Sequence, residues 1–327
     1  MLKTFLNFLD STGVSKLVND PVMLVKTIIM YVFVVVLLYL AIKKKFEPLL
    51  LLPIAFGMLL ANLPGANLMH LDWFLEKHIE WGDILNNGGL IDFLYMGVKL
   101  GIYPSLIFMG VGAMTDFTAL ISNPKSLLMG AGAQLGVFVA FFGALLLGFS
   151  PNEAASIGII GGADGPTAIL VTKTLAPALL GAIAIAAYSY MALIPIIQPP
   201  FMRMLTSKKE REITMTALRP VSQTEKLVFP VLVAIVVSII LPDAAPLIGF
   251  LMFGNLLNVC GVTERLSKTA QNELMNIVTI FLGVSVGATA SAENFLKADT
   301  IKIIILGLVA FSISTCGGLI TAKIMCI

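Results

Sequence analysis

Long, uninterrupted apolar runs dominate the hydrophobic pattern of this chain. They occupy residues 22–42, 48–63, 126–149, 174–200, 227–242 and 303–321. Each is close to or above the ~17–20 residues that a helix needs to cross a hydrocarbon core of ~30 Å. Membrane β-strands would instead show segments of ~10 residues with alternating polarity. Because a spanning helix satisfies its backbone hydrogen bonds internally, the pattern predicts an all-α polytopic membrane protein.

Shorter polar stretches divide the chain into segments. The predicted membrane segments are 22–42, 47–64, 96–121, 126–149, 154–172, 174–204, 227–242, 246–262, 272–292 and 301–325. A polar and aromatic insert separates the second and third of them. From these boundaries we expect four regions, which are an amphipathic surface helix at 1–20, a first membrane repeat at 21–172, a linking helix and cytoplasmic loop at 173–226, and a second, incomplete membrane repeat at 227–327.

Charge adds an orientation to this picture. Of the 327 residues, 58% are hydrophobic and 12% are charged, against about 25% charged in soluble domains. Lysine and arginine gather at 43–45 and in the loop 206–226, which predicts that both places are cytoplasmic. Segment 22–42 then runs inward and 227–242 runs outward. This requires that at least one segment between them does not fully cross, and the glycine-rich segments 96–121 and 154–172 are the candidates for broken or re-entrant helices.

The opposed directions suggest an inverted repeat, and short matches support it. Residues 56–60 (FGMLL) match 253–257 (FGNLL) at an offset of 197, and 111–113 (VGA) match 286–288 (VGA) at an offset of 175. Inverted repeats with discontinuous helices are typical of secondary transporters. At the second offset, the counterpart of the glycine-rich segment at 156–170 would begin beyond Ile327. We therefore expect a C-terminally truncated chain that is inactive on its own.

Asp164 is the residue with the clearest chemical signal. It is the one charge between Glu153 and Lys173, and an aspartate in the middle of a membrane helix costs about 2.5–3.5 kcal/mol on insertion scales. Gly162 and Gly165 permit non-helical backbone, and a helix broken here would expose carbonyl oxygens beside the carboxylate. Together these are hard oxygen ligands suited to Na⁺. The alternative is that Asp164 caps the second half-helix, and both roles can coexist.

Other polar residues in apolar sequence are weaker candidates. Thr167 offers a hydroxyl to the same Na⁺ site, and more distant candidate ligands are Thr115, Asn255, Ser285 and Thr289. Packing between helices explains these more distant small and polar residues equally well. Asp116 is a second carboxylate, for which an interfacial cap is the simpler explanation. Tyr188 and Tyr190 each need a hydroxyl partner if buried, so a core role and a catalytic role remain open for both.

Four short sequence motifs of this chain resemble those of one family of membrane proteins. They are 108–117 (FMGVGAMTDF), 158–169 (GIIGGADGPTAI), 187–195 (AYSYMALIP) and 281–288 (FLGVSVGA). The family comprises the β-subunits of the sodium-pumping, biotin-dependent decarboxylases of oxaloacetate, methylmalonyl-CoA and glutaconyl-CoA, and the similarity runs through essentially the whole chain. The resemblance implies an inverted-repeat, elevator-like transporter fold.

The resemblance also implies a function. In this family a biotin carrier and carboxyltransferase α-subunit supplies carboxybiotin, which the β-subunit decarboxylates while it exports Na⁺ and takes up a proton. Asp164 matches the central Na⁺ and proton site, and Tyr190 matches a tyrosine proposed to deliver protons. A small membrane γ-subunit, a homotrimer and a multi-pass location in the bacterial inner membrane are further expectations. The alternative that stays open is a stand-alone Na⁺- or H⁺-coupled solute carrier.

Overall fold

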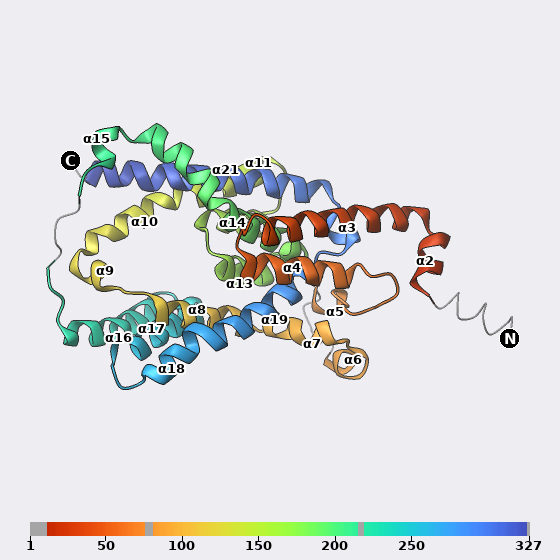
Figure 1. Ribbon diagram of the computed structural model, residues 1–327, viewed down its shortest axis with the longest axis horizontal. Coiled ribbons are helices and arrows are strands. Elements are labelled where there is room, and N and C mark those ends of the chain that lie inside the picture. Colours follow the sequence, from red (N-terminus) through yellow and green to blue (C-terminus); the bar gives the residue numbers. More distant parts are fainter. Residues whose placement is uncertain (1–11, 76–80, 215–218, 326–327) are drawn as a thin grey trace.

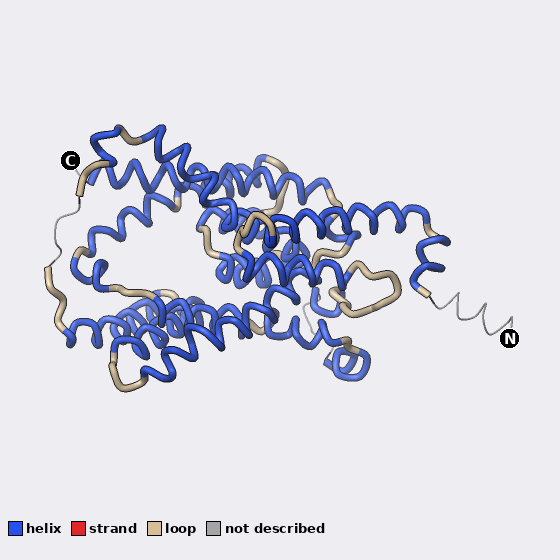
Figure 2. The backbone as a smooth tube through the Cα atoms, viewed as in Figure 1, coloured by secondary structure: helices blue, strands red, loops and turns tan. Residues whose placement is uncertain are grey.

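The computed structural model describes residues 12–75, 81–214 and 219–325, and all regular structure in these ranges is helical (Figures 1 and 2). The all-α fold class predicted from the apolar runs is therefore confirmed. The surface helix expected at 1–20 is represented by the short α2, Gly13–Asn19, while residues 1–11 lie outside the described ranges.

Four helical stretches are long and apolar enough to cross a membrane, namely Pro21–Ile42, Pro124–Leu146, Gln223–Ile240 and Ala298–Met325. Two bent pairs add two spans if each is counted as one. One of them joins α7 (Leu90–Lys99) to α8 (Ile102–Met114) with a bend of 63°. These features are those of a multi-pass membrane protein with broken helices.

The second bent pair lies where the sequence predicted one continuous segment, 174–204. The two helical parts, Pro177–Met191 and Ile196–Leu205, meet at 61°. The sequence between these two parts contains a proline at position 195, and a proline has no backbone N–H to donate to the preceding turn. This linking segment is therefore itself bent, which the length of its apolar run did not indicate.

The helices form two packed groups (Figure 1). The first group contains α3 (Pro21–Ile42), α4 (Pro48–Ala61), α7, α8, α16 (Gln223–Ile240), α17 (Ala245–Val259), α18 (Glu264–Thr269) and α19 (Met275–Ala288). The second contains α10 (Leu127–Ala133), α11 (Leu135–Leu146), α12 (Pro151–Gly158), α13 (Gly165–Leu175), α14 (Leu180–Leu205) and α21 (Ala298–Met325). Short helices complete the described chain: α5 (Asp72–Leu75), α6 (Trp81–Asn87), α9 (Thr118–Ser122), α15 (Lys208–Arg211) and α20 (Ala292–Phe295).

Glycines bring helices of the first group into backbone contact. A Cβ atom added to Gly57 on α4 would lie 2.1 Å from the carbonyl oxygen of Val284 on α19. One added to Gly254 on α17 would lie 1.9 Å from the carbonyl oxygen of Met109 on α8. Gly57 and Gly254 are related by the offset of 197, and Met109 and Val284 by the offset of 175. The same contact is thus made twice, by residues that the proposed repeat makes equivalent.

A second pair of glycine contacts at the same two helix crossings follows the same offsets. A Cβ on Gly112 of α8 would lie 1.8 Å from the carbonyl oxygen of Leu251, and one on Gly287 of α19 would lie 2.1 Å from that of Ile54. Ile54 and Leu251 are related by the offset of 197, and Gly112 and Gly287 by the offset of 175. Small residues at interfaces let membrane helices approach closely. The reciprocal contacts of α4 with α19 and of α17 with α8 support the proposed repeat.

Polar caps explain where several helices begin. The side chain of Asp20 accepts hydrogen bonds of 3.0 Å from the N–H groups of Val22 and Met23, and Pro21 occupies the first turn of α3. Ser222 and Glu225 form a capping box at the start of α16. Such caps satisfy the free N–H groups of a first helical turn. Each of these two spans therefore starts where the polar sequence before it ends.

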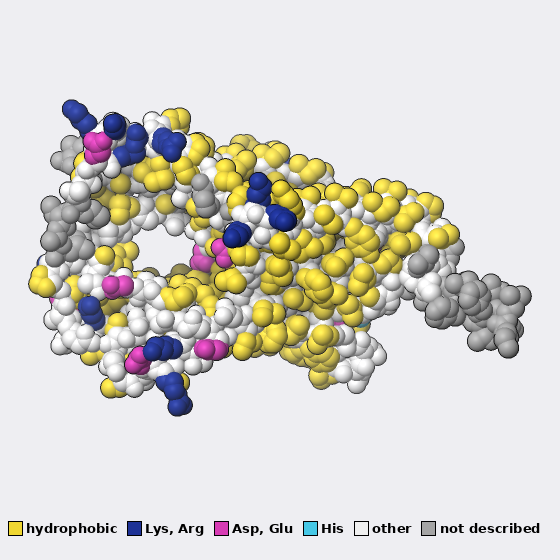
Figure 3. Space-filling view, in the orientation of Figure 1, with side chains coloured by type: hydrophobic (Ala, Val, Ile, Leu, Met, Phe, Trp, Pro, Cys, Tyr) yellow, Lys and Arg dark blue, Asp and Glu magenta, His cyan; other side chains and the backbone are white. Residues whose placement is uncertain are grey.

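Charged side chains gather toward one end of the long axis, and the molecule is hollowed there between the two groups of helices (Figure 3). At this end the ammonium of Lys323 on α21 lies 3.0 Å from Glu210 on α15. The N–H of Ser207 and this ammonium lower the pKa of Glu210 to about 2. On the opposite side, the hydroxyl of Ser122 on α9, which packs against α16, donates to the carbonyl of Arg219. The polar loop 206–226 therefore contacts helices on both sides of the hollow.

Candidate functional site

The segment around Asp164 is broken. Helix α12 passes into a 3₁₀ turn, Ile159–Gly162, and α13 begins at Gly165. Between them Ala163 adopts a left-handed conformation with φ of 57°, and Asp164 is extended with φ of −128°. A left-handed non-glycine residue is uncommon and signals local strain. The predicted break beside Asp164 is therefore present, and it interrupts the hydrogen-bond pattern of a continuous helix.

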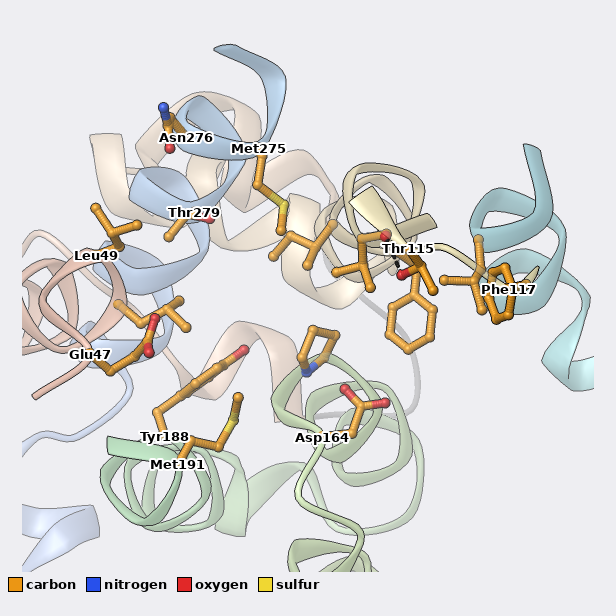
Figure 4. A pocket seen from close by; sticks show the side chains of 16 residues that line it. Glu47, Leu49, Thr115, Phe117, Asp164, Tyr188, Met191, Met275, Asn276 and Thr279 are labelled. Atoms are coloured by element: carbon orange, nitrogen blue, oxygen red, sulfur yellow. Dashed lines mark hydrogen bonds between the residues drawn. The ribbon is translucent and has the colours of Figure 1, made fainter. Parts of the chain in front are cut away.

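Asp164 caps α13 and faces a cavity as well. Its carboxylate accepts a hydrogen bond of 3.5 Å from the N–H of Thr167 and another from the Thr167 hydroxyl. The side chain is half-buried and lines a cavity of about 510 Å³ (Figure 4). Asp164 is therefore the helix cap that the sequence allowed, and the same carboxylate faces a cavity; binding of Na⁺ by this carboxylate stays a prediction.

The cavity lies between the two groups of helices. Figure 4 shows Asp164 and Tyr188 on one wall, from α13 and α14, and Thr279 and Asn276 on the opposite wall, from α19. Most other lining side chains are apolar, and they are Leu49, Leu50, Ile107, Phe108, Val111, Phe117, Pro166, Met191, Leu251 and Met275. Glu47, just before α4, adds a second carboxylate. A few polar groups in an apolar cleft are typical of small-molecule sites.

Thr115 shares this cavity, and Asn255 supports it from behind. Thr115 lines the cavity, although its hydroxyl donates to the carbonyl of Val111 at 2.7 Å. The amide of Asn255, which is 1% exposed, donates to the Thr115 carbonyl at 2.8 Å. Asn255 is not among the cavity-lining residues. Its position indicates that it holds the end of α8 in place rather than meeting a ligand directly.

Ser285 and Thr289 lie away from Asp164. Both are buried on α19, and each hydroxyl donates within its own helix, Ser285 to Phe281 at 2.6 Å and Thr289 to Val286 at 2.7 Å. Neither lines the Asp164 cavity. Thr289 instead borders a separate polar pocket of about 270 Å³. In this conformation the structure therefore does not bring these two predicted candidates to the site.

Gly162 lies on the other face of the break. It lines a second cavity of about 370 Å³, together with Gln134, Gln198 and Ser314. The hydroxyl of Ser314 on α21 donates to the carbonyl of Gly161 at 2.6 Å. The broken segment thus separates two cavities. Gly165, by contrast, is buried beside Tyr188.

Tyr188 and Tyr190 occupy different surroundings. The hydroxyl of Tyr190 donates to the carbonyl of Ile304, and its ring lies 5.6 Å from that of Phe311, both on α21. Tyr190 is not among the residues that line the Asp164 cavity, whereas Tyr188 is. The sequence singled out Tyr190 through a resemblance and left both a core role and a catalytic role open for Tyr188. The signal available for Tyr188 was a hydroxyl inside an apolar run, which both tyrosines share.

Asp116 behaves as a surface cap. It is exposed and accepts a hydrogen bond of 2.9 Å from the N–H of Thr118. The Thr118 hydroxyl and this N–H lower the pKa of Asp116. The carboxylate is not among those that line the Asp164 cavity. Its surroundings agree with the simpler of the two explanations drawn from the sequence.

Comparisons with known proteins point to one family. A family model described as the Na⁺-transporting oxaloacetate decarboxylase beta subunit matches residues 26–327. The methylmalonyl-CoA decarboxylase subunit beta of Propionigenium modestum is 56% identical over 335 residues, which cover 99% of this chain and 83% of that protein. The glutaconyl-CoA decarboxylase subunit beta of Acidaminococcus fermentans is 55% identical, with 89% and 73% covered. The oxaloacetate decarboxylase beta chain of Haemophilus ducreyi is 48% identical, with 91% and 79% covered.

Proposed function

Because the chain belongs to the family of Na⁺-transporting decarboxylase β-subunits, we propose that it decarboxylates carboxybiotin carried by a partner subunit and couples this step to Na⁺ export and proton uptake. The observation that carries the proposal is the position of Asp164. A carboxylate at a broken membrane helix borders a cavity large enough for a small substrate. Discontinuous helices with exposed backbone oxygens are the usual place for coupling ions in transporters.

The ligands for Na⁺ come from the start of α13. The carboxylate of Asp164 supplies the negative charge, and the hydroxyl of Thr167 adjoins it. The carbonyls of Gly162 and Gly165, which flank Asp164 in sequence, stay proposed ligands, and Gly162 would have to approach from the second cavity. These are oxygen donors, which suit a hard cation. Thr115 stands across the same cavity as a further candidate. We assign Asn255 a supporting role, because its amide bonds the Thr115 carbonyl.

The apolar lining of the cavity favours the chemistry. Decarboxylation breaks the bond between the ureido nitrogen and the carboxyl carbon, the electron pair stays on nitrogen, CO₂ leaves, and the nitrogen takes up one proton. Charge on the carboxylate disappears as CO₂ forms, so a site that excludes water favours the transition state over the charged ground state. The proton consumed in this step is the one that the proposed uptake supplies.

The remaining components of the proposal rest on the family resemblance. We expect a biotin carrier and carboxyltransferase α-subunit at the charged end of the molecule, where the hollow opens (Figure 3). A small membrane γ-subunit, a homotrimer and the bacterial inner membrane complete the proposed setting. The elevator-like movement also remains a proposal, which the division of the helices into two packed groups supports.

The test uses the complex with its α- and γ-subunits, reconstituted in proteoliposomes. We expect Na⁺ to stimulate decarboxylation of free carboxybiotin, and radioactive Na⁺ to accumulate only while decarboxylation proceeds. If Na⁺ moves at the same rate without carboxybiotin and without the α-subunit, a solute carrier replaces the proposed function. If carboxybiotin is not decarboxylated at any Na⁺ concentration, the proposal is wrong.

Replacing Tyr190 with phenylalanine tests the proposed route of the proton. The variant loses the hydrogen bond to the Ile304 carbonyl on α21. If this hydroxyl passes protons, turnover should fall about 10-fold or more, and most at high pH where protons are scarce. The concentration of Na⁺ that gives half-maximal stimulation should stay unchanged. A pH profile identical to that of the wild type would count against this role.

A further inference from the structure

The hydroxyl of Tyr188 is buried without a partner. The side chain is 1% exposed, and within the part of the chain that the structure describes its oxygen makes no hydrogen bond. A buried polar group left unpaired destabilises the fold, and the great majority are paired in native proteins. An unpaired hydroxyl on the wall of a cavity therefore indicates a ligand that pairs with it.

Packing against α13 sets the position of this ring. A Cβ atom added to Gly165 would lie 2.2 Å from Cε1 and 2.9 Å from the hydroxyl oxygen of Tyr188. The glycine beside Asp164 is thus required for the tyrosine to lie where it does. The ring extends from α14 along the cavity wall, with its hydroxyl directed toward the middle of the cavity (Figure 4).

Hydrogen-bond donors at this end of the cavity are few. The hydroxyl of Thr167 already donates to Asp164, and that of Thr115 donates to Val111. The side chains of Asn276 and Thr279 offer donors from the opposite wall. Tyr188 is therefore the donor that stands beside Asp164 and remains available to an incoming group.

We propose that the Tyr188 hydroxyl binds the substrate, donating a hydrogen bond to the carboxylate of the carboxylated ureido ring next to Asp164. This inference rests on the proposed function and deepens it by locating the substrate. An anion that enters an apolar cavity loses its hydration, and a donor to a charged acceptor compensates more strongly than one to a neutral acceptor.

The same geometry accounts for stimulation by a cation. Asp164 and Glu47 both place negative charge on the cavity wall, which opposes entry of an anionic substrate. A cation bound at Asp164 neutralises one of these charges, and the substrate carboxylate then meets the Tyr188 hydroxyl without that repulsion. Substrate and Na⁺ therefore bind with positive coupling, and each raises the affinity of the other by the same factor.

The test is the Tyr188→Phe variant of the complex, assayed with free carboxybiotin. We expect KM for carboxybiotin to rise about 10- to 100-fold, as for the loss of a hydrogen bond to a charged group. The Na⁺ concentration for half-maximal thermal stabilisation, measured without carboxybiotin, should stay within about twofold of wild type, because the cation ligands remain. The melting temperature should not fall, since the hydroxyl has no partner to lose.

Tyr95→Phe is the matched control. Tyr95 is equally buried, packs against Phe74 in the same core cluster, and is not among the residues that line this cavity. KM for carboxybiotin should be unchanged in this variant. Gly165→Ala is the second test variant, because its Cβ pushes the Tyr188 ring away, and it should raise KM in the same direction.

Two outcomes would overturn the inference. One is a Tyr188→Phe complex with the wild-type KM for carboxybiotin. The other is a parallel loss of Na⁺ stabilisation in the absence of substrate, which would place the hydroxyl at the cation instead. Failure of the proposed function is seen separately, as a wild-type complex that does not decarboxylate carboxybiotin under the same conditions.

Discussion

Asp164→Asn is expected to abolish Na⁺-stimulated turnover while the protein still inserts and folds. Asparagine is also a good helix cap, so the hydrogen bond from the Thr167 N–H to this side chain is preserved. The charge is lost, and removing one partner of a half-buried ion pair costs about 3 kcal/mol or more. Na⁺ affinity should therefore fall at least about 100-fold.

The measurement is decarboxylation by the reconstituted complex as a function of Na⁺ concentration, together with uptake of radioactive Na⁺. Asp116→Asn is the matched control, because Asp116 is an exposed cap that does not line the cavity. That control should keep its Na⁺ dependence. Retained Na⁺-coupled turnover in Asp164→Asn would rule out this carboxylate as the ion ligand.

Gly254→Ala is expected to destabilise the protein. The added Cβ would lie 1.9 Å from the carbonyl oxygen of Met109, and the atoms it meets belong to the backbone of α8. A side chain can rotate away, whereas here two helices must separate. Overpacking costs about 1–3 kcal/mol and occasionally more. A clash with backbone belongs to the upper part of this range, which exceeds the ~1 kcal/mol that alanine gains over glycine in a helix. The melting temperature of the purified protein should fall clearly.

Gly249→Ala provides the control in the same helix. Among the residues that the structure describes, no atom outside α17 lies within 4 Å of the position that its Cβ would take, so alanine there should be neutral or stabilising. Gly57→Ala should resemble Gly254→Ala, because the two glycines make equivalent contacts in α4 and α17. Equal melting temperatures for Gly254→Ala and Gly249→Ala would contradict this account of the helix crossing.

The sequence by itself determined the class of the protein and the place of the break. Apolar length requires membrane helices, because no other element of that length satisfies its backbone in lipid. The break lies beside the glycines that predicted it, although the residues that leave helical geometry are Ala163 and Asp164, between the 3₁₀ turn that ends at Gly162 and the helix that begins at Gly165. Pro166 suits the first turn of the next helix. Asp164 stands out because an isolated charge in such a run is costly. All of these arguments are local, so they needed no tertiary contacts.

The tertiary structure decided which polar residues surround Asp164. Ser285 and Thr289 carry hydroxyls of the kind that can bind a cation, yet these hydroxyls bond carbonyls in their own helix. The hydroxyl of Thr115 makes the same kind of bond to Val111, yet Thr115 lines the cavity at the end of α8. Sequence cannot distinguish these cases, because all three hydroxyls bond locally, and only the packing of the helices decides which of them borders the cavity.

The two tyrosines of α14 show the same limit most clearly. Residues two positions apart in a helix point about 200° apart, so Tyr188 and Tyr190 cannot both face the Asp164 cavity. The pattern of residues in α14 does not reveal which of them does. That depends on how α14 is rotated against α13 and α21. Gly165 admits the Tyr188 ring on one side, and Gly307 admits the Tyr190 ring on the other.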